Sequence, residues 1–368
     1  MVNRKIARRD FLVCAGEAAL GLPLLTGAPL RALAFAENTA RVFRGIFAIL
    51  QTPFTLDDKF AEGDFEREVN FCVRGGAQGL VWPQLYGEFN VLTEAERRRG
   101  AEILLRTPRG KTAAVIGVQT ADRETALRLT RHAAENRADA VISLPPYRGS
   151  VTLEAVADYY RAIAEASGLP VFIQNSGGEW GPALPTDFVI RLAKENPRLG
   201  YVKEEISPVP LRLEQYKKSG EFHGVFSGNA GRNLLNELAR GSSGTMPACE
   251  FVDVDVQIYN LAASGKMAEA RALFEKLLPM INLEETYGLG FAKAVLVRRG
   301  IFKTAKRRGK PDVNVLDSVD EQELNAWWEQ LKPYLKAYVS LPNGPSRSVR
   351  AAYSRPLATR RNSSVSGA

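Results

Sequence analysis

Residues 171–204, VFIQNSGGEWGPALPTDFVIRLAKENPRLGYVKE, contain one complete unit of the pattern that decides the fold. Two short apolar runs, Val171–Gln174 and Gly200–Lys203, have the length of buried strands, and the segment between them, Asp187–Glu195, has helical spacing. A strand, a helix and a second strand in this order predict two parallel strands joined by a crossover helix.

The same unit recurs on both sides of this stretch, from Arg44 to Met246. The eight apolar runs that we interpret as strands are Gly45–Gln51, Gly79–Trp82, Thr112–Val118, Ala140–Leu144, Val171–Gln174, Gly200–Lys203, Gly224–Ser227 and Gly244–Met246. Eight such strands alternating with helices predict an α/β fold, a (β/α)8 TIM barrel. A doubly wound sheet is the alternative, but no Gly-rich phosphate-binding sequence follows a strand.

More helices follow the eighth strand and predict a C-terminal helical extension of the barrel. The helical segments are Asp253–Ala263, Lys266–Leu278, Gly290–Arg299 and Glu321–Tyr338. We therefore assign residues 37–250 to the barrel and residues 251–340 to the extension. Residues 341–368 are rich in Ser, Pro, Gly, Asn and Arg and lack hydrophobic periodicity, which predicts a disordered basic tail.

The charge of the chain lies at its two ends. Residues 1–36 carry a net charge of +3 and residues 341–368 carry +5, which accounts for the whole net charge of +8. The body between them is neutral, which weighs against nucleic acid as a partner. With three cysteines, no Cys-x-x-Cys pair and two distant histidines, we expect no disulfide framework, no His-rich metal site and no cofactor.

The first 36 residues resemble a twin-arginine signal peptide. Arg8-Arg9-Asp10-Phe11-Leu12 is followed by an apolar stretch and by Ala34-Phe35-Ala36, a small-x-small cleavage pattern. We expect cleavage near Glu37 and a periplasmic or otherwise exported protein. No run of 18 residues is continuously apolar, so we expect no stable insertion into a membrane.

Reactive groups of a (β/α)8 barrel lie at the C-terminal ends of its strands. The residues at such positions are Leu85, Tyr86, Gly87, Glu88, Tyr147, Gln174, Asn175 and Lys203. Burial disfavours the charged form of a lysine, and a neutral amine can attack a carbonyl carbon to form a Schiff base. A surface lysine paired with Glu204 or Glu205 is the alternative interpretation of Lys203.

At these positions the sequence resembles the dihydrodipicolinate synthase and N-acetylneuraminate lyase family. The matching pieces are Gln51-Thr52-Pro53-Phe54, Gly87-Glu88 with Leu92-Thr93-Glu94-Ala95-Glu96-Arg97, Pro145-Pro146-Tyr147 and Val202-Lys203-Glu204. The resemblance implies a barrel with C-terminal helices, a homo-oligomer (dimer or tetramer), and a lyase that forms a Schiff base with a 2-keto acid such as pyruvate. It also implies that Lys203 is the imine-forming lysine.

The sequence departs from the family at two positions near this lysine. The family pattern Gly-Thr-Thr-Gly-Glu reads Gln84-Leu85-Tyr86-Gly87-Glu88 here, so Leu85 and Tyr86 can bind a substrate carboxylate only through their backbone amides. The family tyrosine on strand five is replaced by Gln174, which cannot exchange a proton at neutral pH. Proton transfer would then depend on Tyr86, Tyr147, Glu204, Glu205 or a water molecule held by Gln174.

Two classes of function remain open from the sequence. The first is a lyase, either an aldolase or a hydratase/dehydratase, that acts on a 2-keto acid through Lys203. The second is a non-catalytic barrel of the same family that binds a small molecule. The arginine that binds a dicarboxylate in the synthases has no clear counterpart other than Arg148, which disfavours a dicarboxylic product.

Overall fold

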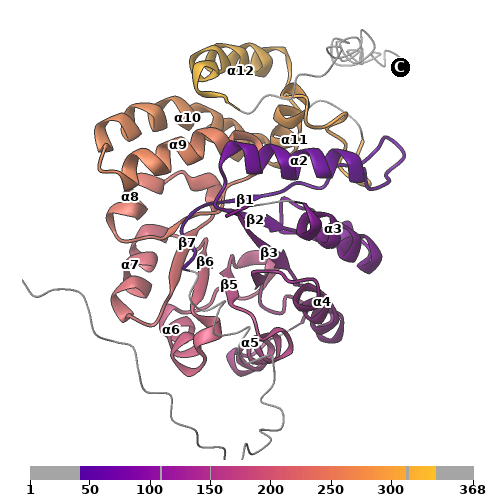
Figure 1. The fold of residues 1–368 in the computed structure, drawn as a ribbon, viewed down its shortest axis with the longest axis vertical. Coiled ribbons are helices and arrows are strands. Elements are labelled where there is room, and N and C mark those ends of the chain that lie inside the picture. Colours follow the sequence, from indigo (N-terminus) through magenta and orange to yellow (C-terminus); the bar gives the residue numbers. More distant parts are fainter. Residues whose placement is uncertain (1–41, 108–109, 150, 312–314, 337–368) are drawn as a thin grey trace, which may run out of the picture.

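The computed structural model describes residues 42–107, 110–149, 151–311 and 315–336 of the chain (Figure 1). Eight parallel strands pair in chain order and close into one barrel. The strands are β1 (Gly45–Ile49), β2 (Gly79–Trp82), β3 (Ala113–Gly117), β4 (Ala140–Ser143), β5 (Val171–Asn175), β6 (Tyr201–Glu204), β7 (Gly224–Ser227) and β8 (Gly244–Thr245). The predicted (β/α)8 barrel is confirmed, and the doubly wound alternative is wrong because β1 pairs with β8.

Helices cover the outside of the barrel between successive strands. They are α2 (Glu62–Gly75), α3 (Glu94–Arg106), α4 (Arg123–Glu135), α5 (Leu153–Ser167), α6 (Thr186–Glu195), α7 (Val209–Ser219) and α8 (Leu234–Ala239). Side chains fix where several of them begin: Thr93 and Glu96 form a capping box at α3, and Thr152 accepts a hydrogen bond from the Ala155 amide at α5. Each helix therefore begins at a defined distance from the strand end before it.

Successive strand residues point alternately into the barrel and out toward the helices. In β1, Phe47 and Ile49 belong to the inner cluster of buried side chains, whereas Ile46 and Ala48 belong to the outer cluster. The inner cluster contains five aromatic side chains, and the Phe172 and Tyr201 rings lie 4.8 Å apart. These rings fill the barrel interior, so the space for a ligand lies at one end of it.

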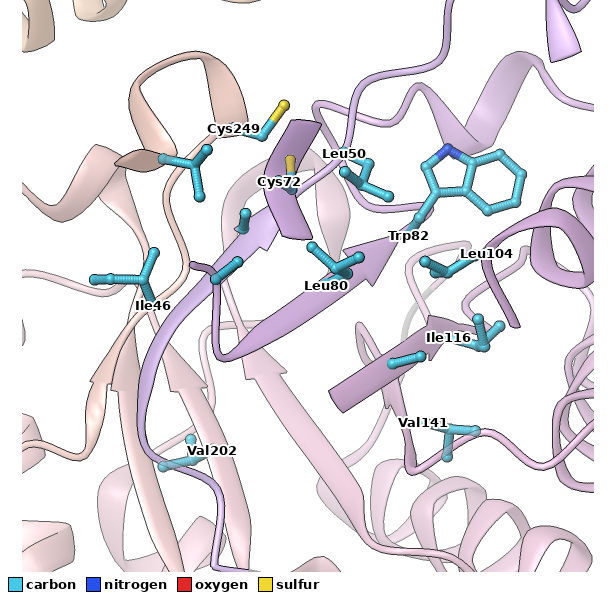
Figure 2. Close-up of a cluster of buried hydrophobic side chains, with 14 of the residues drawn as sticks. Ile46, Leu50, Cys72, Leu80, Trp82, Leu104, Ile116, Val141, Val202 and Cys249 are labelled. Carbon is cyan, nitrogen blue, oxygen red and sulfur yellow. The ribbon is translucent and has the colours of Figure 1, made fainter. Parts of the chain in front are cut away.

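The outer cluster joins the strands to the helices (Figure 2). Trp82 of β2 is fully buried there, and its indole nitrogen donates a hydrogen bond to the Thr52 hydroxyl over 3.0 Å. Cys72 and Cys249 are also buried, and both are free thiols. This layer holds each strand in register with the helix that follows it.

The C-terminal helices pack together on one side of the barrel, next to α2 (Figure 1). They are α9 (Val252–Ala263), α10 (Met267–Tyr287), α11 (Leu289–Arg298) and α12 (Ser318–Leu331). The end predicted for the second of these helices, at Leu278, is wrong, because α10 continues through Pro279 to Tyr287. The predicted signal peptide at 1–36 and the predicted tail at 341–368 lie outside the described residues.

No helix in the described parts of the chain is both long enough and apolar enough to span a bilayer.

Candidate active site

The alternation of strand residues places Lys203 inside the barrel. Tyr201 belongs to the inner cluster and Val202 to the outer one, so Lys203 points inward again. Gln174 of β5 is its register partner across the β5–β6 ladder. The two side chains therefore project into the same space at the C-terminal end of the barrel.

A carboxylate beyond the end of β6 joins these two side chains. Glu205 Oε1 lies 3.1 Å from Lys203 Nζ, and Glu205 Oε2 accepts a hydrogen bond of 2.7 Å from Gln174 Nε2. The side chains of Lys203 and Glu205 are only 3% and 12% exposed, so water screens their charges weakly. The lysine thus faces a carboxylate that is fixed in position by a neutral amide.

A cavity of about 210 Å³ opens beside this pair. Its lining residues are Ile49, Leu85, Tyr86, Ser176, Lys203, Glu205, Asn229, Ala230, Met246, Ala248, Glu284 and Glu285. Drug-sized ligands occupy roughly 300–1,000 Å³. A cavity below that range suits a small substrate such as a short-chain keto acid.

Leu85 and Tyr86 line the cavity as predicted, and the loop that carries them is tightly held. A Cβ on Gly87 would lie 2.8 Å from the Gln84 nitrogen, and the Gly87 carbonyl accepts a hydrogen bond from the Thr52 hydroxyl. Within the described residues, the backbone amides of Leu85 and Tyr86 donate no hydrogen bond. Gly87 shapes the loop, and the two amides before it are left to bind an anion.

Two residues predicted to bind substrate have other partners in the structure. Glu88 forms a buried ion pair with Lys293 of α11, and burial raises the pKa of its carboxyl. The Asn175 amide bonds to both the carbonyl and the amide of Leu184 and to the Glu204 carboxylate. Neither residue lines the cavity, and their assignment to substrate binding stays a prediction.

Tyr147 is not brought to Lys203 either. It lines a second cavity of about 410 Å³, where its ring packs edge-on against Phe89 and Trp180 at centroid distances of 6.0 and 5.6 Å. Arg148 lines this second cavity as well. Tyr147 and Lys203 thus line different cavities, and the catalytic role predicted for Tyr147 stays a prediction.

The sequence interpretation missed the wall of the cavity that comes from outside the barrel strands. Glu284 and Glu285 reach it from the last turn of α10, beyond the helix end that we predicted. Asn229 and Ala230 reach it from the turn after β7, and both have left-handed backbone angles, with φ of 51° and 53°. Non-glycine residues with strained backbone angles cluster at functional sites. This backbone strain marks the turn in the structure, but it is not visible in the sequence.

Burial shifts the protonation of the groups on this wall. It raises the pKa of the Tyr86 phenol and raises the pKa of the Glu284 carboxyl well above its usual range. The pKa of Glu250, which contacts Glu284 from behind, is raised to about 7 for the same reason. The cavity therefore combines an ion-paired carboxylate beside the lysine with a carboxyl group that favours its protonated form.

The barrel holds a buried lysine and a neighbouring carboxylate beside a small cavity at the strand ends. This arrangement is typical of an enzyme whose lysine amine attacks the carbonyl carbon of a small substrate. Comparison with known proteins agrees. A model described as the dihydrodipicolinate synthetase family matches residues 42–323, and the chain belongs to this family. The resemblance seen in the sequence is thereby confirmed, and the protein is a lyase of a family that acts on 2-keto acids through a Schiff base.

Similar proteins include enzymes of sugar-acid metabolism. The chain is 30% identical over 251 residues to the probable 2-dehydro-3-deoxy-D-pentonate aldolase of Escherichia coli K12, covering 66% of this chain and 83% of that protein. It is 25% identical over 271 residues to L-2-keto-3-deoxyarabonate dehydratase of Azospirillum brasilense, covering 72% and 87%. The crystal structure of dihydrodipicolinate synthase from Rhodopseudomonas palustris matches with a TM-score of 0.70 at 25% identity, covering 78% and 97%.

Proposed function

We propose that Lys203 forms the Schiff base and that the substrate is a 2-keto acid with a hydroxylated chain. The observation that carries this proposal is the Lys203–Glu205–Gln174 arrangement at the edge of the cavity. Glu205 lies close enough to take a proton from the lysine ammonium, which leaves a neutral amine. That amine attacks the C2 carbonyl carbon, and loss of water gives the imine.

Glu205 also takes over proton transfer from the family tyrosine that Gln174 replaces. Once the imine has formed, its carboxylate can remove a proton from C3 and produce the enamine. Glu204, the other carboxylate considered from the sequence, is occupied: Arg212 lies 3.0 Å from it, and the Tyr216 hydroxyl donates to it over 2.7 Å. Gln174 keeps Glu205 oriented without competing for the proton.

The substrate carboxylate fits the loop after β2. The backbone amides of Leu85 and Tyr86 would bind it there, with no need for the threonine hydroxyls of the family pattern. The rest of the cavity carries the Glu284 carboxyl group, which favours its neutral form, and the Glu285 carboxylate, which repels a second carboxylate. Hydroxyl groups can hydrogen-bond to such a wall, and the 2-keto-3-deoxy sugar acids named in the two relatives have that chemistry.

Borohydride trapping tests the proposal. Pyruvate with borohydride should add the mass of a reduced pyruvyl adduct to the wild-type protein and none to Lys203→Ala, as measured by intact mass. Lys194→Ala is the matched control, because Lys194 is exposed on α6 and should leave the labelling unchanged. If no 2-keto acid labels Lys203 while such acids still raise the melting temperature, the protein is a non-catalytic binding barrel.

We further propose export by the twin-arginine route and assembly into a dimer or tetramer. The first described strand, β1, begins at Gly45, so removal of residues 1–36 leaves every described element intact. The oligomer follows from membership of the family. Light scattering on protein without residues 1–36 should give the mass of two or four chains, and a monomer at micromolar concentration would contradict it.

A further inference from the structure

The cavity has a second titratable wall, on the side of the barrel opposite the lysine. In a closed ring of eight strands, β2 and β6 lie four strands apart and therefore face each other. Lys203 and Glu205 come from the end of β6, and Tyr86 comes from the loop after β2. Glu284 of α10 joins Tyr86, and both line the same cavity as Lys203.

This second wall continues inward as a chain of acidic groups. The Tyr86 phenol and the Glu250 carboxyl group both lie beside the Glu284 carboxyl group. Glu250 is 1% exposed, and no N–H or O–H group of the described residues donates to either of its side-chain oxygens. Burial side by side disfavours a negative charge on both carboxyl groups, so the pair favours keeping one proton.

Arg299 favours the charged form of Glu250, but the acidic groups around the pair favour retention of a proton. The Arg299 guanidinium is engaged by Asp253 through two bonds of 2.9 and 2.7 Å and by the Glu250 backbone carbonyl. Asp255 of α9 is buried nearby and disfavours further negative charge on Glu284. Glu285, the next residue on α10, is ion-paired with Arg232 over 3.0 Å. The cavity thus contains one carboxylate placed to accept a proton and one carboxyl group that has a proton to give.

We propose that Glu284 donates a proton to a departing hydroxyl group of the lysine-bound substrate, with Tyr86 and Glu250 as positioning residues, so that the site performs loss of water and not cleavage of a carbon–carbon bond. This inference rests on the proposed function, because it requires the imine at Lys203. It adds which reaction follows the imine, dehydration or aldol cleavage, because the fold and the family allow both.

The steps balance on a 2-keto acid that bears a hydroxyl at C4. After the imine forms at C2, Glu205 takes a proton from C3, and the C–H electrons form the C2–C3 double bond of the enamine. Those electrons then move to form a C3–C4 double bond, the C4–O bond breaks, and the hydroxyl leaves as water with the proton of Glu284. Hydrolysis of the resulting iminium consumes one water, frees the unsaturated keto acid and regenerates Lys203. The proton on Glu205 returns to Glu284 and resets the site.

Cleavage of the C3–C4 bond requires a base near C4, where dehydration requires an acid. An aldol cleavage begins with removal of the C4 hydroxyl proton, so the group facing C4 must be a base. A carboxyl group that favours keeping its proton beside Glu250 is in the wrong state for that role. Two carboxyl groups driven to different protonation states by their surroundings divide acid and base duties in this way in other active sites.

The test separates imine formation from loss of water. The probes are the C4 epimers of five- and six-carbon 2-keto-3-deoxy sugar acids, assayed by mass for loss of water and by a coupled assay for released pyruvate. We expect the wild type to release water and no pyruvate from at least one probe. Glu284→Gln should lower dehydration on the order of 10²–10⁴-fold while borohydride labelling of Lys203 by pyruvate stays at the wild-type level.

Two further variants keep the result interpretable. Tyr86→Phe should lower dehydration by a smaller factor with labelling intact, because it removes only the hydroxyl that orients Glu284. Glu275→Gln makes the same chemical change at an exposed position of α10 and should change nothing. Infrared difference spectra should show a carboxylic acid C=O band in the wild type that Glu284→Gln lacks.

Several results would overturn the inference. They are full dehydration by Glu284→Gln, pyruvate release by the wild type, imine formation with no loss of water from any probe, and absence of the carboxylic acid band. Absence of the imine in the wild type is a different outcome, since it removes the proposed function itself.

Discussion

Lys203 and Gln174 face each other on neighbouring strands, and both contact the carboxylate of Glu205. Asn175 follows Gln174 and Glu204 follows Lys203; both point to the other side and bond to each other. One strand alternation therefore separates the residues that can meet a substrate from those that hold the strand ends together.

Glu205→Gln tests the role of this carboxylate at constant side-chain size. The amide cannot accept a proton, so exchange of the C3 protons of pyruvate for deuterium should fall on the order of 10²–10⁴-fold. Proton NMR of pyruvate in D₂O measures this exchange, with Lys203→Ala as the background. Exchange at the wild-type rate would assign the base elsewhere.

Glu237 gives the fold a pH dependence that is separate from the site. It is buried in α8 against the Ser227 hydroxyl, and burial raises its pKa from 4.5 to about 7. The folded state therefore binds this proton more tightly than the unfolded state does. The contribution of Glu237 to stability must fall as pH rises from about 4.5 to about 7, because ionisation then costs the folded state alone.

Glu237→Gln should remove the loss of stability that Glu237 causes as the pH rises. The free energy of unfolding of the variant, relative to wild type, should increase by about 2 kcal/mol between pH 5 and pH 8. Urea denaturation of both proteins at the two pH values measures the difference. A difference that does not change with pH would show that Glu237 is ionised in the folded protein at pH 5.

Part of the site could be derived from the sequence at the scale of single residues. The alternation that puts Lys203 inward also puts Gln174 and Glu205 inward, and it excludes Asn175 and Glu204. The family pattern identified the candidate site residues but did not predict where their side chains point. It offered Tyr147 as one candidate for proton transfer, and the ring packs with Phe89 and Trp180 at another cavity.

At the scale of elements, α10 shows why the rest could not be derived. Proline removes a backbone donor and usually ends or bends a helix, so the pattern around Pro279 favours an end there. The helix continues because Leu277, Met280 and Ile281 on both sides of the proline are buried against neighbouring elements. Tertiary packing thus extends α10 far enough to place Glu284 at the cavity. No local sequence pattern predicts this extension.

The ion pair between Lys293 and Glu88 joins α11 to the loop after β2. The Lys293 side chain is fully buried and also donates to the Lys306 carbonyl over 2.8 Å. Lys293→Met should therefore lower the free energy of unfolding by about 3–5 kcal/mol, because it leaves a buried carboxylate without its partner. Urea denaturation measures the loss.

A second substitution distinguishes this structural role from substrate binding. Glu88→Gln combined with Lys293→Met should recover much of the lost stability, and Lys303→Met, at an exposed lysine nearby, should have little effect. Borohydride labelling of Lys203 by pyruvate should persist in the double variant. Loss of labelling in a stable double variant would return Glu88 to the substrate site.

At the scale of the molecule, the barrel follows from a pattern repeated eight times, and each repeat needs only local periodicity and a short connection. The placement of the C-terminal helices depends on buried pairs between distant segments, such as Arg299 with Asp253. These pairs are invisible to any local pattern. The base next to the lysine is therefore encoded two residues further along the chain, at the end of β6, whereas the opposite wall of the cavity includes Glu284 from the distant helix α10.

The export that we propose also concerns the whole molecule, because the twin-arginine route carries folded proteins. Nothing in the described barrel requires oxidation to fold: Cys72 and Cys249 are buried free thiols, and every described element lies after residue 41.

Arg8→Lys with Arg9→Lys should leave the uncleaved precursor in the cytoplasm, whereas Arg31→Lys, outside the motif, should be exported like the wild type. Cell fractionation and intact mass measure both, and the exported protein should begin near Glu37. Wild-type protein found uncleaved in the cytoplasm, with trapping activity at Lys203 intact, would separate the enzyme from the export signal and place its substrate inside the cell.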